Sequence, residues 1–337
     1  MKYIVCEKPG KFILKEKKAL VRKENEALLQ INKVGICGTD FHAYAGNQPF
    51  FTYPRILGHE LASTVLEIDD ENKKGIKVGD NVVVMPYISC GKCIACRIGK
   101  TNCCTNLTVL GVHGDGGMQE QITVPAEILL PANNLSDNQM TIVEPLSIGA
   151  HAVRRANIKP DETVAVVGSG PIGIGIMKFA QIAGAKVIAI DMNEKRLTYA
   201  KEKIGVDYIV KAGENAVDNV SKITNGDLCT VVFDASGNKF ALESCPDYMS
   251  HGGCFVVVGL SKGELTYMHP KLHAKEMTLM CSRNATSEDF EYVISVLDQF
   301  PTESFITHNV SFLDMINHFD SWLKSETGVL KATVNFN

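Results

Sequence analysis

The sequence predicts an α/β protein in which a β-rich N-terminal domain precedes a doubly wound parallel sheet. From residue 1 to about 135, short apolar or alternating runs such as 27–31 and 82–85 are broken by Gly, Pro and Asn, which is typical of strands and turns. From about residue 150, β-rich runs alternate with stretches of helical pattern, as in a parallel sheet. A chain of 337 residues is long enough for about two such domains.

The second half of the chain contains six predicted strands. The first is 163–167; a helical stretch follows and runs to Gly184, and the second strand is 186–190, which is followed directly by Asp191. The other four predicted strands are 207–210, 230–234, 254–258 and 277–280. Six strands with five connections predict a doubly wound sheet.

The chain after Arg283 differs from this alternation. Two helical stretches at about 288–299 and 313–323 are followed by a predicted strand at 331–334. We expect this tail to return to the N-terminal domain.

Composition and charge limit the classes of partner. Apolar residues make up 45% of the chain and charged residues 21%, with a mean hydropathy of +0.02. The sequence has no run of 18 uncharged apolar residues, so we expect no membrane span. Thirty-four Lys and Arg residues against 38 Asp and Glu residues give a net charge of -4, which does not favour nucleic acid or anionic lipid as a partner.

We expect the protein to be located in the cytoplasm. Neither end carries a pattern typical of secretion, lipid attachment or retention. The eleven cysteines are an odd number in a large chain, and four of them are clustered. This usage favours thiolate metal binding in a reducing compartment over a disulfide framework.

A glycine-rich turn lies between the strand 163–167 and the helical stretch that follows it. The turn has the pattern G-x-G-x-x-G, and its residues are Gly168, Gly170, Pro171, Ile172 and Gly173. Glycines here permit a tight turn and bring backbone N–H groups and the positive end of a helix close to a pyrophosphate. We therefore expect a dinucleotide site, the alternative being a turn that packs a strand on a helix without a ligand.

An acidic residue follows the next predicted strand. Asp191 stands 21 positions after Gly170, where its carboxylate can accept hydrogen bonds from both hydroxyls of an adenosine ribose. A 2'-phosphate would meet like charge there, so the sequence favours NAD over NADP. Arg196, five residues further on, is an objection, because its guanidinium could pair with such a phosphate.

Several cysteines fall close together at about 89–105. Three are spaced as C-x2-C-x2-C, and a fourth follows after seven residues; this set is Cys90, Cys93, Cys96 and Cys104. Four thiolates in one short loop can close a tetrahedral zinc shell without a vacant position, which makes the predicted zinc structural. Cys103 is an alternative to its neighbour Cys104 as the fourth ligand.

A second set of metal-binding residues is dispersed along the chain. It comprises Cys37, His59 and Glu144. One thiolate, one imidazole and one carboxylate suit a zinc ion that keeps an open position for water or substrate. Each residue is ambiguous by itself, because a single His is commonly structural and a single Cys commonly acts as a small buried hydrophobe.

Taken together, these motifs resemble the zinc-dependent medium-chain alcohol dehydrogenase family over nearly the whole chain. In that family a GroES-like catalytic domain, built from the N-terminal part and the C-terminal tail, holds a catalytic zinc that faces an inserted Rossmann domain. The resemblance implies a GroES-like domain of residues 1–145 and 286–337 and a Rossmann NAD-binding domain of residues 146–285. It also implies two zinc ions per chain, one catalytic and one structural.

The resemblance assigns roles to residues of the first domain. Cys37, His59 and Glu144 correspond to the catalytic zinc ligands, and Glu60 is an adjacent carboxylate that can approach or exchange at the metal. Asp40 falls at the position that orients the ligating His. For the structural zinc, the spacing in the family favours Cys104 over Cys103.

The resemblance extends to a branch of the family. The segment 144–147 is similar to the polyol dehydrogenases, in which Glu replaces a Cys ligand of ethanol-type enzymes. Further segments are similar to bacterial L-gulonate and L-galactonate 5-dehydrogenases, namely 42–46, 47–50, 110–113 and 282–284. Ala43 stands where sorbitol enzymes carry an aromatic residue, so the resemblance does not favour sorbitol itself.

The resemblance also implies how protons and substrate are handled. Thr39 and His42 occupy the hydroxyl and imidazole positions of the proton relay, although each could instead be a turn hydroxyl or a solvated surface imidazole. A sugar-acid carboxylate needs a cationic partner, for which Arg283 is the first candidate. His113 and Arg55 are lesser candidates.

The predicted function is oxidation of a secondary alcohol of a sugar acid, of L-gulonate or L-galactonate type, or of a polyol to a ketone, with hydride transfer to NAD. One alternative is an L-threonine 3-dehydrogenase, to which the segment 37–40 is similar. Others are a non-catalytic protein that binds NAD and zinc, and a zinc-ribbon nucleic-acid module for the cysteine loop. The family commonly forms dimers or tetramers, so the resemblance implies a homo-oligomer.

Overall fold

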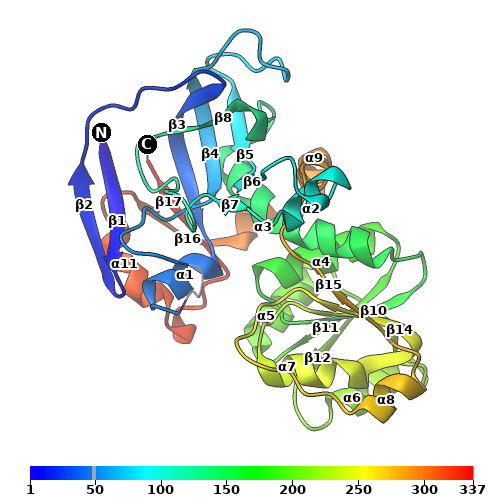
Figure 1. The fold of residues 1–337 in the computed structure, drawn as a ribbon. Coiled ribbons are helices and arrows are strands. Elements are labelled where there is room, and N and C mark those ends of the chain that lie inside the picture. The colour runs from blue at the N-terminus through cyan, green and yellow to red at the C-terminus, as the bar shows by residue number, and fades with distance from the viewer. Residues whose placement is uncertain (48–50, 337) are drawn as a thin grey trace. The chain divides into compact units, whose positions relative to one another are not determined.

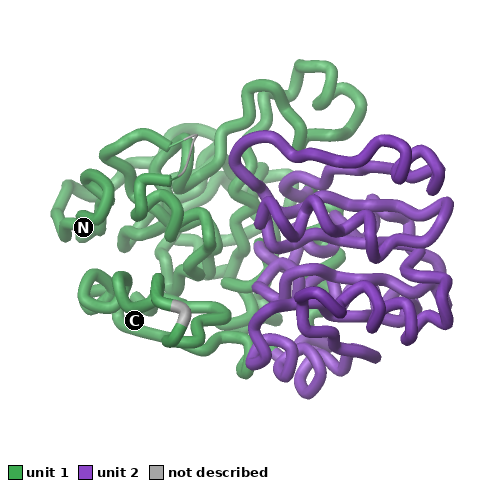
Figure 2. The backbone as a smooth tube through the Cα atoms, turned by 90° about the horizontal axis from the view of Figure 1, so that it is seen from below, with its two compact units in different colours: residues 1–144, 286–297, 302–337 green, residues 145–285, 298–301 purple. Residues whose placement is uncertain are grey.

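The computed structural model describes residues 1–47 and 51–336. Of the segment 47–50, which contributes to the sugar-acid resemblance, only Asn47 lies within the described residues. The chain divides into two compact units, shown in different colours in Figure 2. Unit 1 contains residues 1–144, 286–297 and 302–337, and unit 2 contains residues 145–285 and 298–301.

Unit 1 is built on a seven-stranded sheet (Figure 1). Its strands are β3 (Glu26–Ile36), β4 (Glu60–Glu67), β5 (Asn81–Val84), β8 (Gln121–Pro125), β9 (Leu129–Pro131), β16 (Ile306–Ser311) and β17 (Lys331–Asn335). The strand order is β16-β17-β3-β4-β5-β9, and β8 pairs with β3. Two-stranded sheets accompany it, formed by β1 (Lys2–Lys8) with β2 (Lys11–Glu16) and by β6 (Tyr87–Ile88) with β7 (Thr108–Val109).

Short helices lie between the strands of unit 1. They are α1 (Gly38–Tyr44), α2 (Ile94–Arg97), α9 (Ser287–Val296), α10 (Thr302–Phe305) and α11 (Met315–Trp322). The longer α3 (Asp137–Ala156) begins in unit 1 and continues into unit 2. The predicted helices at 288–299 and 313–323 correspond to α9 and α11, and the predicted strand at 331–334 corresponds to β17.

Helix α1 lies in a region where the sequence predicts only strands and turns. It begins after Cys37, whose sulfur accepts from the backbone N–H of Asp40, while the Asp40 carboxylate accepts from the backbone N–H of Cys37 at 2.9 Å. This capping box satisfies N–H groups that a helix start leaves unpaired. The hydrophobic pattern did not reveal the helix because it is only seven residues long.

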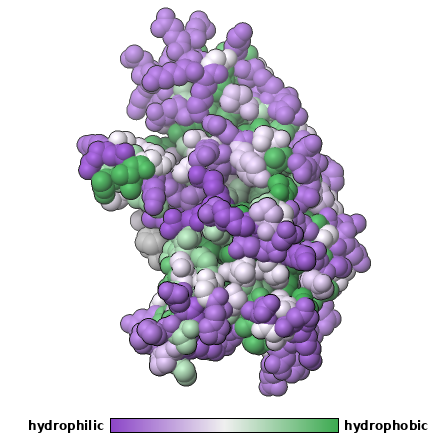
Figure 3. Space-filling view, turned by 90° about the vertical axis from the view of Figure 1, so that its right-hand side faces the viewer, coloured by the Kyte–Doolittle hydropathy of each residue, from purple (hydrophilic) through white to green (hydrophobic). Residues whose placement is uncertain are grey.

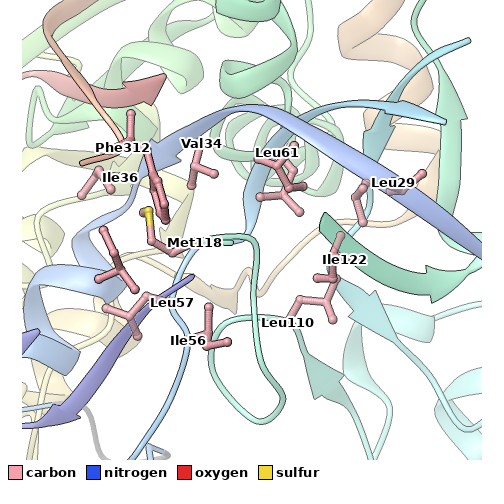
Figure 4. Packing of buried hydrophobic residues seen from close by; sticks show 14 of the residues in the cluster. Leu29, Val34, Ile36, Ile56, Leu57, Leu61, Leu110, Met118, Ile122 and Phe312 are labelled. Carbon is pink, nitrogen blue, oxygen red and sulfur yellow. The ribbon is translucent and has the colours of Figure 1, made fainter. Parts of the chain in front are cut away.

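The core of unit 1 joins segments that are far apart in the sequence. Figure 4 shows part of it, including Leu29, Val34 and Ile36 of β3, Leu61 of β4, Met118, and Phe312 from the C-terminal segment. Burying each large side chain contributes about 1.5–3 kcal/mol. Since β17 pairs antiparallel with β3, the C-terminal tail is part of the same sheet as the N-terminal strands.

Unit 2 is a six-stranded parallel sheet with the order β12-β11-β10-β13-β14-β15. Its strands are β10 (Thr163–Val167), β11 (Lys186–Asp191), β12 (Tyr208–Lys211), β13 (Cys229–Asp234), β14 (Met249–Val257) and β15 (Thr278–Cys281). Its helices include α4 (Pro171–Ile182), α5 (Glu194–Tyr199), α6 (Ala216–Ile223), α7 (Lys239–Ser244) and α8 (His269–Ala274). The six predicted strands all form, with ends that shift by a few residues.

The strand order of unit 2 reverses at its centre. From β10 the chain proceeds outward to β11 and β12, and then returns to β13 on the other side of β10. The carboxyl ends of the strands at such a switch point form the usual ligand-binding edge of an open parallel sheet. The strands β10 and β13 are almost entirely buried, which agrees with their continuous apolar runs.

The face drawn in Figure 3 is largely hydrophilic, and its hydrophobic residues form small, separate groups. Among the described residues, no helix combines the length and the apolar character that crossing a membrane requires.

A buried ion pair ties β17 to β4 within unit 1. Lys331 Nζ lies 2.7 Å from each carboxylate oxygen of Glu60 and 3.2 Å from the carbonyl oxygen of Ile36. Lys331 is 1% exposed and Glu60 is 0% exposed. Burial disfavours the charged ammonium, but the Glu60 carboxylate outweighs this effect and raises the pKa of Lys331 above its ordinary value.

Removing the lysine should destabilise unit 1 strongly. We expect Lys331→Met to lower the free energy of unfolding by about 3–5 kcal/mol, because the Glu60 carboxylate then stays buried without its partner. Urea unfolding followed by tryptophan fluorescence measures this, since the chain has one tryptophan, Trp322, which is buried in the core of unit 1. The exposed Lys324 provides the control variant Lys324→Met. A loss below about 1 kcal/mol for Lys331→Met would contradict the prediction.

Candidate active site

Three ligand-type side chains converge where β3 ends and β4 begins. Cys37 directly follows β3, and His59 directly precedes Glu60, the first residue of β4. The two strands are antiparallel with Gly35 opposite Glu60, so this register brings the two ends together. The ligand atoms of Cys37, His59 and Glu60 all lie within 4.8 Å of one another.

A glycine makes room for the carboxylate in this group. A Cβ atom on Gly35 would lie 2.1 Å from Glu60 Oε2, which is far inside van der Waals contact. Any larger residue at position 35 would therefore displace Glu60 from His59 and Cys37.

Asp40 holds the backbone on both sides of the site. Its buried carboxylate accepts hydrogen bonds from the N–H groups of Cys37, at 2.9 Å, and of Gly58, at 3.4 Å. The resemblance gives Asp40 the role of orienting the ligating His. The hydrogen bonds show how it acts in this chain, because Gly58 is the residue directly before His59.

His59 has the features of a metal ligand. It is 5% exposed, and no group in the described part of the chain hydrogen-bonds its Nδ1 atom. Burial disfavours a charged imidazole, but Cys37 and Asp40 outweigh this effect and raise the pKa of His59 well above its ordinary value. The buried Nδ1 atom has no hydrogen-bond partner among the described residues, and a cation bound at the ring would take the place of the proton that these neighbours favour.

Glu144 lies beside this group without belonging to it. It is on α3 and 5% exposed, and its Oε1 atom accepts a hydrogen bond from the buried hydroxyl of Tyr87. Among the described residues, the carboxylate that converges with Cys37 and His59 is that of Glu60. The structure thus brings together the predicted ligands Cys37 and His59 and the predicted adjacent carboxylate, with the predicted ligand Glu144 next to them.

The charges of the site fit a divalent cation. Three buried carboxyl groups, those of Asp40, Glu60 and Glu144, lie in this region, and the ammonium group of Lys331 pairs with Glu60. Burial raises the pKa values of Asp40 and Glu144, which shows how unfavourable their charges are there. A zinc ion would offset this negative excess, and sulfur, nitrogen and oxygen donors are the ligands that zinc takes.

Lys331 and Tyr87 are the parts of this site that sequence reasoning missed. Lys331 is the first residue of a predicted strand, and the pairing of Ala332 with Ile36 places it beside Cys37. Tyr87 lies in a strand of two residues. Strand pairing places both residues at the site, and the local sequence pattern does not reveal which strands pair.

The two relay residues lie on α1, directly after Cys37. Thr39 is half-buried and His42 is exposed. They are three positions apart on one helix and therefore lie on the same side of it. Proton transfer to solvent requires a half-buried hydroxyl near the site followed by an exposed imidazole, which is the order of Thr39 and His42.

The cysteine loop forms a second metal-binding cluster. The sulfur atoms of Cys90, Cys93, Cys96 and Cys104 all lie within 4.8 Å of one another, whereas Cys103 is exposed and outside the group. The sulfurs of Cys93 and Cys96 are 3.5 Å apart. Four zinc–sulfur bonds of about 2.3 Å give a tetrahedron with an edge of about 3.8 Å, so the spacing fits a zinc ion.

The backbone of the loop favours thiolates. The N–H groups of Cys90 and Asn106 donate to the sulfur of Cys104 at 3.2 and 3.4 Å. Hydrogen bonds from the backbone at Cys96 and Thr105 lower the pKa of Cys93 to about 5, whereas burial and the sulfurs of Cys93 and Cys104 raise the pKa of Cys96 to about 11. Because zinc binds the thiolate form, the backbone hydrogen bonds favour the metal-binding form of Cys93.

The glycine-rich turn lies at the carboxyl end of β10. Gly168 has a φ of +99°, and a Cβ atom on Gly173 would lie 1.8 Å from the carbonyl oxygen of Gly168, so both positions require glycine. Gly170 caps the 12-residue helix α4, with Pro171 and Ile172 in its first turn. The N–H groups at this helix start are the donors that a pyrophosphate needs.

Two charged residues lie beside this turn. Asp191 ends β11, and its carboxylate accepts from the N–H groups of Ser169, at 2.6 Å, and Asn193, at 2.8 Å. Arg196 is on α5, with its Nη1 atom 3.8 Å from the point where a Cβ on Gly170 would lie. The structure therefore gathers Gly170, Asp191 and Arg196 at one edge of the sheet, as a dinucleotide site requires.

The three predicted cations for the substrate have different surroundings. Arg55 forms an ion pair with Asp115 at 3.3 Å. His113 is exposed, and its Nδ1 atom accepts from the N–H group of Val109 at 3.1 Å, which fixes it within its own turn. Arg283 is exposed and follows β15 in unit 2.

Comparison with known proteins identifies the family. Residues 23–134 match the alcohol dehydrogenase GroES-like domain, and residues 171–299 match the family described as zinc-binding dehydrogenase. The chain is 38% identical over 338 residues to L-galactonate-5-dehydrogenase of Escherichia coli (strain K12), a match that covers 100% of this chain and 99% of that protein. It is 33% identical over 264 residues to sorbitol dehydrogenase of Bacillus subtilis (strain 168), with coverages of 76% and 74%.

A solved structure agrees with these matches. The alcohol dehydrogenase RspB of Escherichia coli CFT073, complexed with NADH, has a TM-score of 0.92 and 29% identity to this chain, and the match covers 100% of this chain and 99% of that one. The predicted fold class is therefore confirmed, with a GroES-like part and a parallel-sheet Rossmann part. With both domain families matched and a relative aligned along its full length, this chain belongs to the zinc-dependent medium-chain alcohol dehydrogenase family.

Proposed function

We propose that the protein oxidises a secondary alcohol of a sugar acid of L-gulonate or L-galactonate type to a ketone, with NAD as the hydride acceptor. The observation that carries the proposal is the convergence of Cys37, His59 and Glu60 in a buried, negatively charged site. The similarity to L-galactonate-5-dehydrogenase over the whole chain supports this substrate class, and the similarity to sorbitol dehydrogenase supports polyols as the wider class.

The chain's own residues supply the remaining parts of the reaction. Zinc bound at the site would act as a Lewis acid and lower the pKa of the substrate hydroxyl. Cys37, His59 and Glu144 would hold the zinc ion, and Glu60 is the adjacent carboxylate that could exchange as a ligand. The Thr39 hydroxyl would accept the substrate proton in a hydrogen bond, and the exposed His42 imidazole would transfer a proton to solvent.

The turn at the carboxyl end of β10 is the proposed cofactor site. The residues there would hold NAD, which would supply the hydride acceptor. Backbone N–H groups at the start of α4 would hold its pyrophosphate, and the Asp191 carboxylate would accept from the ribose hydroxyls. Arg196, beside Gly170, would contribute positive charge near the pyrophosphate.

The domain roles follow from these sites. We assign the catalytic role to residues 1–145 and 286–337 and the cofactor role to residues 146–285. The structural zinc is assigned to the cluster of Cys90, Cys93, Cys96 and Cys104.

We also propose a cytoplasmic homo-oligomer, either a dimer or a tetramer. Strand β15 is at the edge of the unit 2 sheet, and its Leu279 is 52% exposed, so a second copy could pair with this edge. The free cysteines of the chain are suited to a reducing compartment.

A substrate panel tests the proposed reaction. We expect NADH formation to be fastest with L-gulonate or L-galactonate and slower with sorbitol, because of the whole-chain similarity to a sugar-acid enzyme. Treatment with a chelator should abolish the rate, and added zinc should restore it. The control variant Cys37→Ser should stay inactive after zinc is added. Preference for L-threonine would contradict the sugar-acid assignment and support the alternative enzyme, while inactivity with all substrates would favour a non-catalytic role.

Cofactor preference tests the role of Asp191. We expect kcat/KM to be at least about tenfold higher with NAD than with NADP, a difference of about 1.4 kcal/mol, because the carboxylate repels a 2'-phosphate. Asp191→Ser should reduce this preference, since the repulsion is lost while Arg196 remains. The exposed Asp218 of α6 provides the control variant Asp218→Asn. Equal efficiency with both cofactors in the unchanged protein would contradict the role.

Steady-state kinetics test Arg283 as the partner of the substrate carboxylate. We expect Arg283→Ala to raise KM about tenfold or more for a sugar acid and to change KM for sorbitol little, since the neutral polyol has no charge to pair. Sorbitol thus serves as the internal control. Similar increases of KM for both substrates would exclude this role.

A further inference from the structure

Tyr87 connects the cysteine loop to the proposed catalytic site. It is on β6, whose partner strand is β7, with Tyr87 opposite Val109. All four clustered cysteines lie between these two strands, Cys90 three residues after Tyr87 and Cys104 five residues before Val109. The side chain of Tyr87 donates its hydroxyl hydrogen to Glu144 Oε1.

The position of the Tyr87 side chain is well defined. It is 6% exposed, and its ring packs edge-on against Phe290 of α9, with the ring centroids 6.2 Å apart. A displacement of β6 would therefore be transmitted to Glu144.

The loop between β6 and β7 has little core of its own. Ile94 and Ile98 on and after α2 are 58% and 60% exposed, and three of the clustered cysteines are only half-buried. Apolar burial thus contributes little to holding the loop closed, and a metal ion bound by its four thiolates would be its main crosslink. The base of that crosslinked loop is the β6–β7 pair, which carries Tyr87.

The two carboxylates of the catalytic site have different supports. Both oxygens of Glu60 accept from Lys331, which belongs to the large sheet of unit 1. Glu144 accepts from Tyr87, which belongs to the small sheet at the base of the loop. Loosening the loop should therefore disturb Glu144 and leave Glu60 in place.

We propose that Tyr87 is a positioning residue through which metal binding in the cysteine loop strengthens zinc binding at the Cys37, His59 and Glu144 site. The proposal rests on the proposed zinc sites and not on the substrate. Residues that hydrogen-bond a metal ligand orient it, and their loss commonly weakens metal binding 10–100-fold.

Zinc titration against a competing chelator tests the first half of the proposal. Tyr87→Phe keeps the ring and removes the hydroxyl, so we expect one of the two zinc affinities to fall about 10–100-fold and the other to stay unchanged. Cys37→Ser shows which binding step belongs to the catalytic site. Tyr267→Phe is the matched control, because the Tyr267 hydroxyl donates to the carbonyl of Leu242 in unit 2, at 3.4 Å. A catalytic-site affinity for Tyr87→Phe within about twofold of the unchanged protein would overturn the proposal.

A double-mutant cycle tests the coupling itself. Cys93→Ser should lower the zinc affinity of the cysteine loop. It should also lower the zinc affinity of the catalytic site, by a factor similar to that found for Tyr87→Phe. In the Tyr87→Phe background the same change should have no further effect at the catalytic site, because the connection is already broken. Equal losses in both backgrounds would overturn the coupling. If Cys93→Ser fails to fold by Trp322 fluorescence, the Tyr87→Phe titration decides alone.

The titration also separates this proposal from the proposed function. Unchanged protein that binds only one zinc ion would contradict the coupling, and unchanged protein that binds no zinc would contradict both proposals. If the protein binds two zinc ions and Tyr87→Phe changes neither affinity, the coupling is contradicted and the proposed dehydrogenase function is unaffected. Inactivity toward every sugar acid, with the expected fall in zinc affinity, would contradict the substrate class and support the coupling.

Discussion

The antiparallel pairing of β3 with β4 is the constraint on which the catalytic site depends. Cys37 and His59 are separated by more than twenty residues, and the register that sets Gly35 opposite Glu60 brings them to one point. Because side chains alternate between the faces of a strand, a shift of one residue would turn Glu60 away from Cys37 and His59. The Asp40 carboxylate reinforces the arrangement by holding the backbone at Cys37 and Gly58.

Charge balance is the second constraint. The site buries carboxylates that would be unfavourable in a dry interior, and it compensates them with Lys331 and with room for a cation. This explains how the same residues serve both stability and chemistry. The Lys331 ammonium group pairs with the Glu60 carboxylate, while the Cys37 thiol, the His59 imidazole and the Glu144 carboxylate are the proposed zinc ligands.

The sequence predicted those parts of the molecule that have local signals. The strand and glycine pattern around Gly168 predicted β10, the turn and α4, and the cysteine spacing predicted the loop cluster, because these groups are close along the chain. Residues joined only by strand pairing were not predictable in this way. Lys331 contacts Glu60 although the two are 271 positions apart in the sequence. Tyr87, which contacts Glu144, lies in a strand of only two residues. Glu144 is an intermediate case, since its motif made it a predicted ligand while its place beside the convergent group required the structure.

The strand that carries Lys331 also determines when the site can form during synthesis. Cys37, His59 and Glu60 leave the ribosome early, whereas β17 follows only after all of unit 2 has been translated. Until then the carboxylate of Glu60 has no ammonium partner and the sheet of unit 1 lacks a strand beside β3. A nascent chain can therefore fold its nucleotide-binding sheet before Lys331 completes the buried ion pair of unit 1.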